Sequence, residues 1–247
     1  MVCALTIKSA GAPDACAARA IIGVPIAESE ASKNPRLRMR DSSPPRPKMP
    51  ERNRVTPYGE IIATPLRGNW LGNRGCIHRG HDIVRPWASK HWITCVLEYK
   101  GWVAPKWVPG RWTALFFYDE ALAFAAGHRP CALCRRGDYN RFQIAVGIRG
   151  ANAIDSRLHE ERLENRSKRL HAFPWRELPA GAYVDVDAVP HVVLVDALLP
   201  WSSQSGYGEA RARPHTGDAR LITPPSSVHA ILAGYAPQIG GPLEKKR

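Results

Sequence analysis

Two different periods of hydrophobic positions follow one another along the chain. From Thr56 onward, short runs of β-branched and aromatic residues such as GEIIATPL, WITCVLEY and GWVAPKWV stand between glycines, prolines and asparagines, which predicts short strands and hairpins. The next stretch, FFYDEALAFAAG, predicts a short helix with Asp119 and Glu120 in its first turn and Gly127 as the left-handed residue after its end. Pro130 suits the first turn of a second helix, running from about Cys131 through RRGDYNRFQIAV.

Charged residues dominate the segment that follows. AIDSRLHEERLENRSKRLHAF predicts a third helix with a sparse apolar stripe, exposed on one side. Beyond it, YVDVD and HVVLVDALLPW predict a hairpin, and SSVHAILAG predicts a short terminal helix ended by Gly234. The pattern therefore predicts an α+β protein, and it contains neither an internal repeat nor a glycine-rich phosphate loop.

The first part of the chain has no apolar period of either kind. It is rich in proline, serine and arginine, which predicts a disordered basic arm at residues 1–54. Met39 and Met49 offer internal starts, so whether residues 1–48 are translated stays open. After the arm we expect a zinc-stabilised module of β-hairpins and helices at 55–150, a connecting helix at 151–175, and a small β-rich C-terminal unit with a short terminal helix at 176–247.

Composition sets the class of protein. The chain has 247 residues, of which 44% are hydrophobic, as in globular proteins. No uninterrupted apolar run approaches the roughly 18 residues of a membrane span, and Lys8, Asp14 and Arg19 break the N-terminus. We therefore expect no membrane partner, no secretory signal, a cytoplasmic location and reduced cysteines.

Four of the six cysteines fall between residues 76 and 134, which predicts one shared site. The CxxC spacing at the expected helix start brings two sulfurs close enough to share an ion, and Zn²⁺ then needs two more ligands. Cys76 and His78 are two apart and point to the same side of an extended strand. The preferred zinc ligands are Cys76, His78, Cys131 and Cys134, with Cys95 as the substitute and His81 and His128 as weaker options.

The cysteines allow other interpretations. A redox pair or simply packed thiols stay open, although the segment before the CxxC is a predicted helix and not the strand of a thioredoxin-like unit. A zinc deaminase would need His-x-Glu or Cys-x-Glu upstream, and the histidines at 78, 81 and 91 are followed two residues on by Gly80, Ile83 and Ile93. The deaminase interpretation is therefore excluded.

The segment LFFYDEALAFAAGHRPCALCRR, at about residues 115–136, resembles the second half of the Ada-like zinc-binding module of DNA methyl-phosphotriester repair proteins. The resemblance implies that Cys131 and Cys134 are half of a four-ligand zinc site. In those proteins the leading thiolate of a nearby Cys-x-x-x-Cys pair accepts a methyl group; no such pair stands here, and Cys76 would be the sacrificial thiolate if there is one. The remainder of the chain resembles a family of bacterial hypothetical proteins, from which no activity carries over.

The formal net charge of +13 favours a polyanionic partner, although a basic solvated surface without a partner is an open alternative. We expect Arg129, Arg135 and Arg136, beside the CxxC, to lower the thiol pKa and to contact nucleic acid. Tryptophans interleaved with basic residues between positions 85 and 112 are typical of stacking surfaces for single strands, and equally of hairpin packing.

The charged third helix allows two interpretations. A histidine and a carboxylate at helical spacing, such as His159 with the glutamates beside it, could act as a general base or bind a metal. The commoner case is an exposed face with i,i+4 ion pairs, such as Glu164 with Lys168.

These patterns together predict a DNA-binding or RNA-binding zinc protein, with a structural Cys/His site and a basic surface. The alternatives are a zinc-dependent enzyme with hydrolytic or alkyl-transfer chemistry at the cysteines, and a scaffold that binds another protein. The substrate, the nucleic-acid preference and the oligomeric state are not encoded in any recognisable motif.

Overall fold

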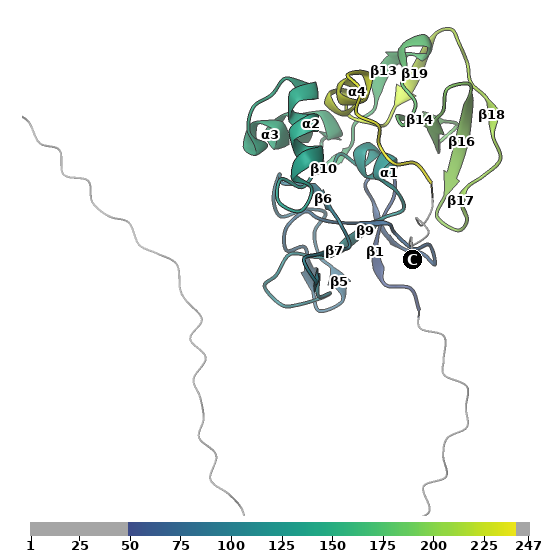
Figure 1. Cartoon of the computed structure of the whole chain (residues 1–247). Coiled ribbons are helices and arrows are strands. Elements are labelled where there is room, and N and C mark those ends of the chain that lie inside the picture. Colours follow the sequence, from purple (N-terminus) through teal and green to yellow (C-terminus); the bar gives the residue numbers. More distant parts are fainter. Residues whose placement is uncertain (1–48, 241–247) are drawn as a thin grey trace, which may run out of the picture. The chain divides into compact units, whose positions relative to one another are not determined.

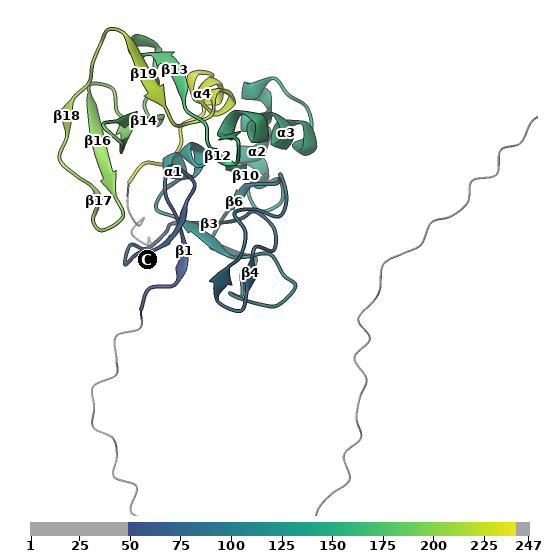
Figure 2. The same cartoon turned by 180° about the vertical axis from the view of Figure 1, so that it is seen from behind.

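The structure is a computed structural model that describes residues 49–240, all of which belong to one compact unit. Figures 1 and 2 show two sheets, with helix α1 (Glu120–Ala125) between them and three further helices to one side. The predicted α+β class is confirmed.

The first sheet has six strands in the order β10-β6-β3-β9-β1-β2. In chain order they are β1 (Arg52–Val55), β2 (Ile61–Ala63), β3 (Trp70–Asn73), β6 (Ile93–Cys95), β9 (Leu115–Phe117) and β10 (Arg129–Pro130). Two of its pairings are parallel, β1 with β9 and β6 with β10. Residues 1–48 of the predicted arm (1–54) lie outside the described residues. Its last three residues, 52–54, are not disordered but belong to strand β1.

The second sheet has seven strands, in the order β13-β19-β14-β15-β16-β17 with β18 paired to β16. They are β13 (His171–Pro174), β14 (Tyr183–Val186), β15 (Val189–Val193), β16 (Ala197–Ser202), β17 (Gly206–Tyr207), β18 (Arg211–Ala212) and β19 (Asp218–Leu221). The predicted hairpin of YVDVD and HVVLVDALLPW is the β14, β15 and β16 meander.

Three two-stranded ribbons complete the strands. They are β4 (His78–Arg79) with β5 (Asp82–Ile83), β7 (Glu98–Tyr99) with β8 (Trp102–Val103), and β11 (Leu163–Glu164) with β12 (Ser167–Lys168). The other helices are α2 (Arg136–Val146), α3 (Ala151–Arg162), α4 (Pro225–Leu232) and a 3-10 turn at Trp175–Glu177. Among residues 49–240, none of these helices has the length and apolar character that crossing a bilayer requires.

Helix α1 is buried along its whole length, which its small alanine side chains permit. Leu122 and Phe117 from this region pack in one cluster with Tyr183, Val192 and Ile222 of the C-terminal part of the chain. The core therefore runs across the boundaries expected near residues 150 and 175. Buried residues of the segments expected at 55–150 and 176–247 thus share one cluster, and Ile154 and Leu158 of the segment expected at 151–175 pack with Phe124 and Ala230 in another.

The sequence signals for α1 act as expected. The Asp119 side chain accepts a hydrogen bond from the backbone N–H of Leu122 at 2.7 Å and so caps the helix, and Gly127 has φ +87°. The second helix begins at Arg136 and not at Cys131, because Arg129–Pro130 pair with β6 as a strand and the next residues form a turn.

The third helix ends earlier than its charge pattern predicts. Asn165 and Arg166 both have positive φ, the conformation of a tight hairpin turn, so the chain reverses into β11 and β12. Glu164 and Lys168 consequently lie on opposite strands, and the predicted i,i+4 ion pair is wrong. The Lys168 Nζ donates instead to the backbone oxygen of Ala125.

Gly127 also leaves room for another side chain. A Cβ at this position would lie 2.5 Å from Cδ of Arg162. A non-glycine residue in the left-handed region costs about 1–3 kcal/mol by its backbone alone. Gly127→Ala should lower the free energy of unfolding by more than this, because the added Cβ also clashes with Arg162. Gly137→Ala, in the first turn of α2 with nothing within 4 Å and an ordinary φ, is the matched control and should be neutral or stabilise by up to about 1 kcal/mol. Urea unfolding of both variants checks this, and equal effects would contradict it.

Candidate metal centre

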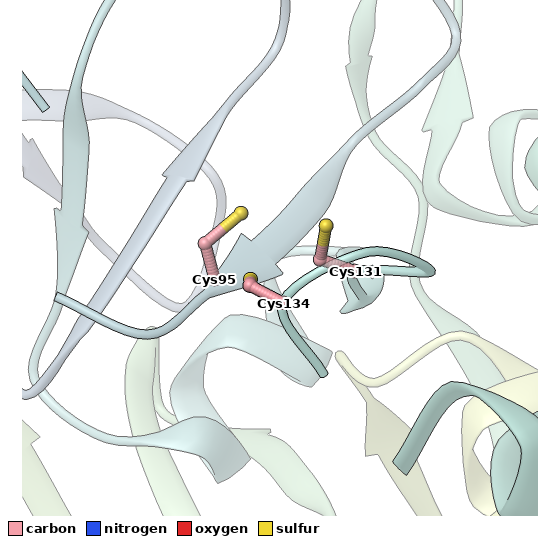
Figure 3. A group of neighbouring side chains, drawn as sticks. All are labelled: Cys95, Cys131 and Cys134. Carbon is pink, nitrogen blue, oxygen red and sulfur yellow. The ribbon is translucent and has the colours of Figure 1, made fainter. Parts of the chain in front are cut away.

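Three cysteines meet at the edge of the first sheet. Cys95 is the last residue of β6, and Cys131 and Cys134 belong to the turn between β10 and α2. Their three Sγ atoms all lie within 4.8 Å of one another. Figure 3 shows the Cys95 side chain on the strand and the other two on the adjoining loop.

Backbone pairing brings these sulfurs together. Strand β10 runs parallel to β6, with Arg129 opposite Ile93 and Pro130 opposite Thr94. The backbone N–H of Cys131 then donates to the carbonyl of Thr94 at 2.8 Å, which places Cys131 beside the end of β6. The turn that follows, closed by the Arg135 N–H on the Cys131 carbonyl at 3.2 Å, brings Cys134 back to the same point.

The cluster fits a thiophilic metal ion. Tetrahedral Zn²⁺ with Zn–S bonds of about 2.3 Å needs sulfurs about 3.8 Å apart, a spacing that small side-chain movements reach from this arrangement. Thiolate is a soft ligand, so a site with three thiolates selects Zn²⁺ over harder cations. Within residues 49–240 no further His, Cys, Asp or Glu joins the group, so the described residues supply three ligands.

The three thiols share their protons unequally. Hydrogen bonds from the Cys134 and Cys95 thiols, together with the backbone N–H of Leu133 at 3.4 Å, lower the pKa of Cys131. The hydrogen bond between Cys95 and Cys131 raises the pKa of Cys95. Cys131 is therefore the position where thiolate charge gathers before a metal binds.

Arg135 anchors the cysteine loop from inside. Its guanidinium is buried, lies 2.5 Å from a Glu120 carboxylate oxygen and 2.7 Å from Asp138, and stacks on Trp70 at 3.9 Å. The same group donates to the Thr94 hydroxyl at 3.0 Å and so ties the loop to β6.

Arg129 is neutralised in the same way. It forms two hydrogen bonds of 2.8 and 2.7 Å with the buried carboxylate of Asp155 and is 3% exposed. Of the three arginines expected to contact nucleic acid, only Arg136 is exposed. Arg129 and Arg135 are structural ion-pair partners in this conformation and cannot reach a phosphate.

The preferred upstream pair is not part of the cysteine group. His78 is buried with its Nδ1 2.6 Å from the Thr113 hydroxyl and its ring against Trp107, and Cys76 is a partly buried free cysteine in the loop before it. His81 lies on the same hairpin, exposed near Trp107. The structure thus brings the substitute, Cys95, to Cys131 and Cys134, and leaves Cys76 and His78 outside.

His128, the other weaker candidate ligand, is buried and does not belong to the group of Cys95, Cys131 and Cys134. Its Nε2 accepts a hydrogen bond from Nε of Arg74 at 3.2 Å. Burial, followed by the neighbouring charges of Arg74 and Arg162, holds its pKa well below the usual range. This imidazole is therefore neutral at physiological pH.

Comparison with known proteins adds no family. No protein-family model, curated protein or solved structure matches the chain. The resemblance to the Ada-like module stays a prediction.

The buried pair of Arg135 with Glu120 should support this loop. Glu120→Gln keeps the shape but leaves the guanidinium with one partly exposed partner, so we expect a loss of about 3 kcal/mol of unfolding free energy. Glu177→Gln is the matched control, because it removes the charge from the exposed pair with Arg176 and should cost less than about 1 kcal/mol. Denaturant unfolding of the two variants checks this; similar losses would show that Glu120 does not act through Arg135.

Proposed function

We propose that this protein binds Zn²⁺ through Cys95, Cys131 and Cys134. The observation that carries the proposal is the convergence of three sulfurs from two segments far apart in the sequence. The CxxC turn with an added thiolate is a common zinc-binding arrangement. The resemblance to the Ada-like module, which includes Cys131 and Cys134, points the same way.

The role we assign to the ion is structural. Zinc here joins the end of β6 to the turn that precedes α2, a connection that otherwise depends on backbone hydrogen bonds and Arg135. Binding energy from such an ion adds to the folding free energy, because the unfolded chain has no preformed site.

One observation favours a second candidate, a chemically active zinc thiolate. Zinc held by three protein ligands is typical of catalytic sites, which keep one position for water or substrate, whereas structural sites use four. The lowered pKa of Cys131 provides a thiolate for alkyl transfer. Cys3 and Cys16 lie outside the described residues.

We also propose that the protein contacts nucleic acid. The net charge of +13 supports this, and so does the exposed Arg136 next to the cysteine loop. Salt-sensitive association is the signature of such contacts, because each cation placed against a phosphate releases a counterion.

Metal content tests the zinc site. The purified full-length protein should carry one zinc ion per chain, Cys95→Ser should lose most of it, and Cys76→Ser should retain it as the matched control. Removal of zinc by a chelator should lower the melting temperature of the wild type to that of Cys95→Ser.

The outcomes separate the alternatives. A folded wild type without metal, or loss of zinc from Cys76→Ser and not from Cys95→Ser, would overturn the three-cysteine site. An unchanged melting temperature after chelation, together with faster alkylation of Cys131, would favour the reactive zinc over the structural one.

Salt titration tests the nucleic-acid contact. Affinity for an oligonucleotide should fall with salt, and Arg136→Gln should reduce the slope of log K against log salt by about 0.7–0.9. Arg176→Gln, which changes another exposed arginine, one already paired with Glu177, is the control and should leave the slope nearly unchanged. Binding that does not respond to salt would contradict the proposal and favour a protein partner.

A further inference from the structure

A second cluster of charged side chains lies around a cavity outside the cysteine group. The cavity has a volume of about 310 Å³ and is lined by four cations, Arg74, Arg162, Arg166 and Lys168, together with Trp87 and Trp92. The one acidic residue in its wall, Glu60, is exposed. The lining residues come from the loops around β2, β3 and β6, the end of α3 and the β11–β12 hairpin.

Two of these cations are fully buried. Arg74 and Arg162 are each 1% exposed, and the Cζ atoms of both lie over the ring of Trp92, at 3.8 and 3.9 Å from its centroid. Cation–π contact of this kind holds the guanidiniums in place but leaves their charge uncompensated.

Hydrogen bonding does not neutralise them either. Arg74 donates to the carbonyl of Gly59 at 2.8 Å and to the neutral ring of His128, and its Nη2 has no partner among the described residues. Arg162 donates to the carbonyls of Gly127 and Lys90 and to Nδ1 of His159 at 2.8 Å, and its Nε has no partner within residues 49–240. All of these acceptors are uncharged.

The contrast with the other buried arginines is direct. Arg129 and Arg135 each face a buried carboxylate at hydrogen-bond distance, as the cost of burying a charge requires. No salt bridge to Arg74, Arg162 or Lys168 is formed among the described residues. A cavity lined by uncompensated cations is therefore complementary to an anion that comes from outside the chain.

Each cation in the wall also disfavours the charge of its neighbours. After burial, the charges of Arg162 and Arg74 lower the pKa of Lys168. Burial lowers the pKa of Arg74 to about 9, so its guanidinium stays charged at neutral pH. A nearby negative charge, or loss of the Lys168 proton, would relieve this repulsion.

We propose that the cavity binds the phosphate group of a phosphate monoester, with the exposed Arg166 as the donor at its mouth and the buried Arg74 and Arg162, with Lys168, supplying positive charge from its wall. A dianion matches several cations better than a monocarboxylate does, and guanidinium forks fit phosphate oxygens. The volume exceeds that of a phosphate group alone, so an organic part can extend along Trp87. A phosphorylated metabolite and the end of a nucleic-acid strand share this chemistry. The proposal does not rest on the zinc site.

Thermal unfolding of the full-length protein tests it. In chloride buffer of constant ionic strength, inorganic phosphate and a nucleoside 5′-monophosphate should each raise the melting temperature by several degrees. Arg166→Gln changes an exposed residue of the hairpin turn and should weaken binding of the monophosphate by about tenfold or more, since hydrogen bonds to charged groups are the strong ones. Arg169→Gln, an exposed arginine nearby that does not line the cavity, should bind as the wild type does.

Lys168→Met separates binding from folding. It removes a cation that Arg74 and Arg162 repel, and also the hydrogen bond to the Ala125 carbonyl, so the informative quantity is the response to phosphate. The increase in melting temperature caused by phosphate should shrink, whereas a merely structural lysine would leave that increase unchanged whatever the melting temperature in chloride.

Titrations with further ligands identify the class of phosphate compound that binds. Binding of the monophosphate assigns a small phosphorylated molecule, and binding only of a 5′-phosphorylated oligonucleotide, not of its 5′-hydroxyl form, assigns a strand end; either upholds the phosphate site. An equal response to acetate or citrate, no response of the wild type to any phosphate, or equal losses in Arg166→Gln and Arg169→Gln would overturn it. Repeating the titration with Cys95→Ser keeps the result independent of zinc.

Discussion

The parallel pairing of β10 with β6 is the constraint on which the rest of the structure depends. It joins a two-residue strand, Arg129–Pro130, to Ile93–Thr94, and the backbone bonds continue at both ends, from Arg129 to Trp92 at 3.1 Å and from Cys131 to Thr94 at 2.8 Å. One end of this short ladder carries the cysteines and the other carries Trp92 and His128. The two candidate sites are thus built on opposite ends of one pair of strands.

Buried charge distinguishes the two ends. Around the cysteine loop, Arg129 and Arg135 each have a carboxylate partner, so these two cations need no ligand to compensate them. Around Trp92, Arg74 and Arg162 have only neutral acceptors. A buried charge without a counter-charge is costly in a protein interior. An unpaired buried cation therefore points to a ligand of opposite charge, whereas a paired one does not.

Local signals were enough to predict helix α1 and the CxxC, since a capping aspartate, a left-handed glycine and a two-cysteine spacing each act within a few residues. The sequence predicts Cys95 only as a substitute ligand, because its place beside Cys131 depends on the pairing of Arg129–Pro130 with β6. The sequence does not indicate this pairing, since proline is unusual in strands. Proline at the start of a helix is common, and this is why the second helix was expected to begin too early.

The cationic cavity was beyond sequence analysis for a related reason. Arg74, Arg162 and Lys168 are separate residues in three different segments, and nothing local distinguishes them from surface cations. Lys168 was even assigned to an exposed helical face. A hairpin turn with two non-glycine residues in the left-handed region, Asn165 and Arg166, carried it inward instead.

The long excursion of chain between Cys95 and Cys131 has a kinetic meaning. Pairing β10 with β6 closes a loop that contains β7, β8, β9 and α1, and closing such a loop has an entropic cost that local helices and ribbons avoid. The third sulfur therefore joins the CxxC pair only when this non-local pairing forms. Protection of all three thiols together would report on the formation of this pairing.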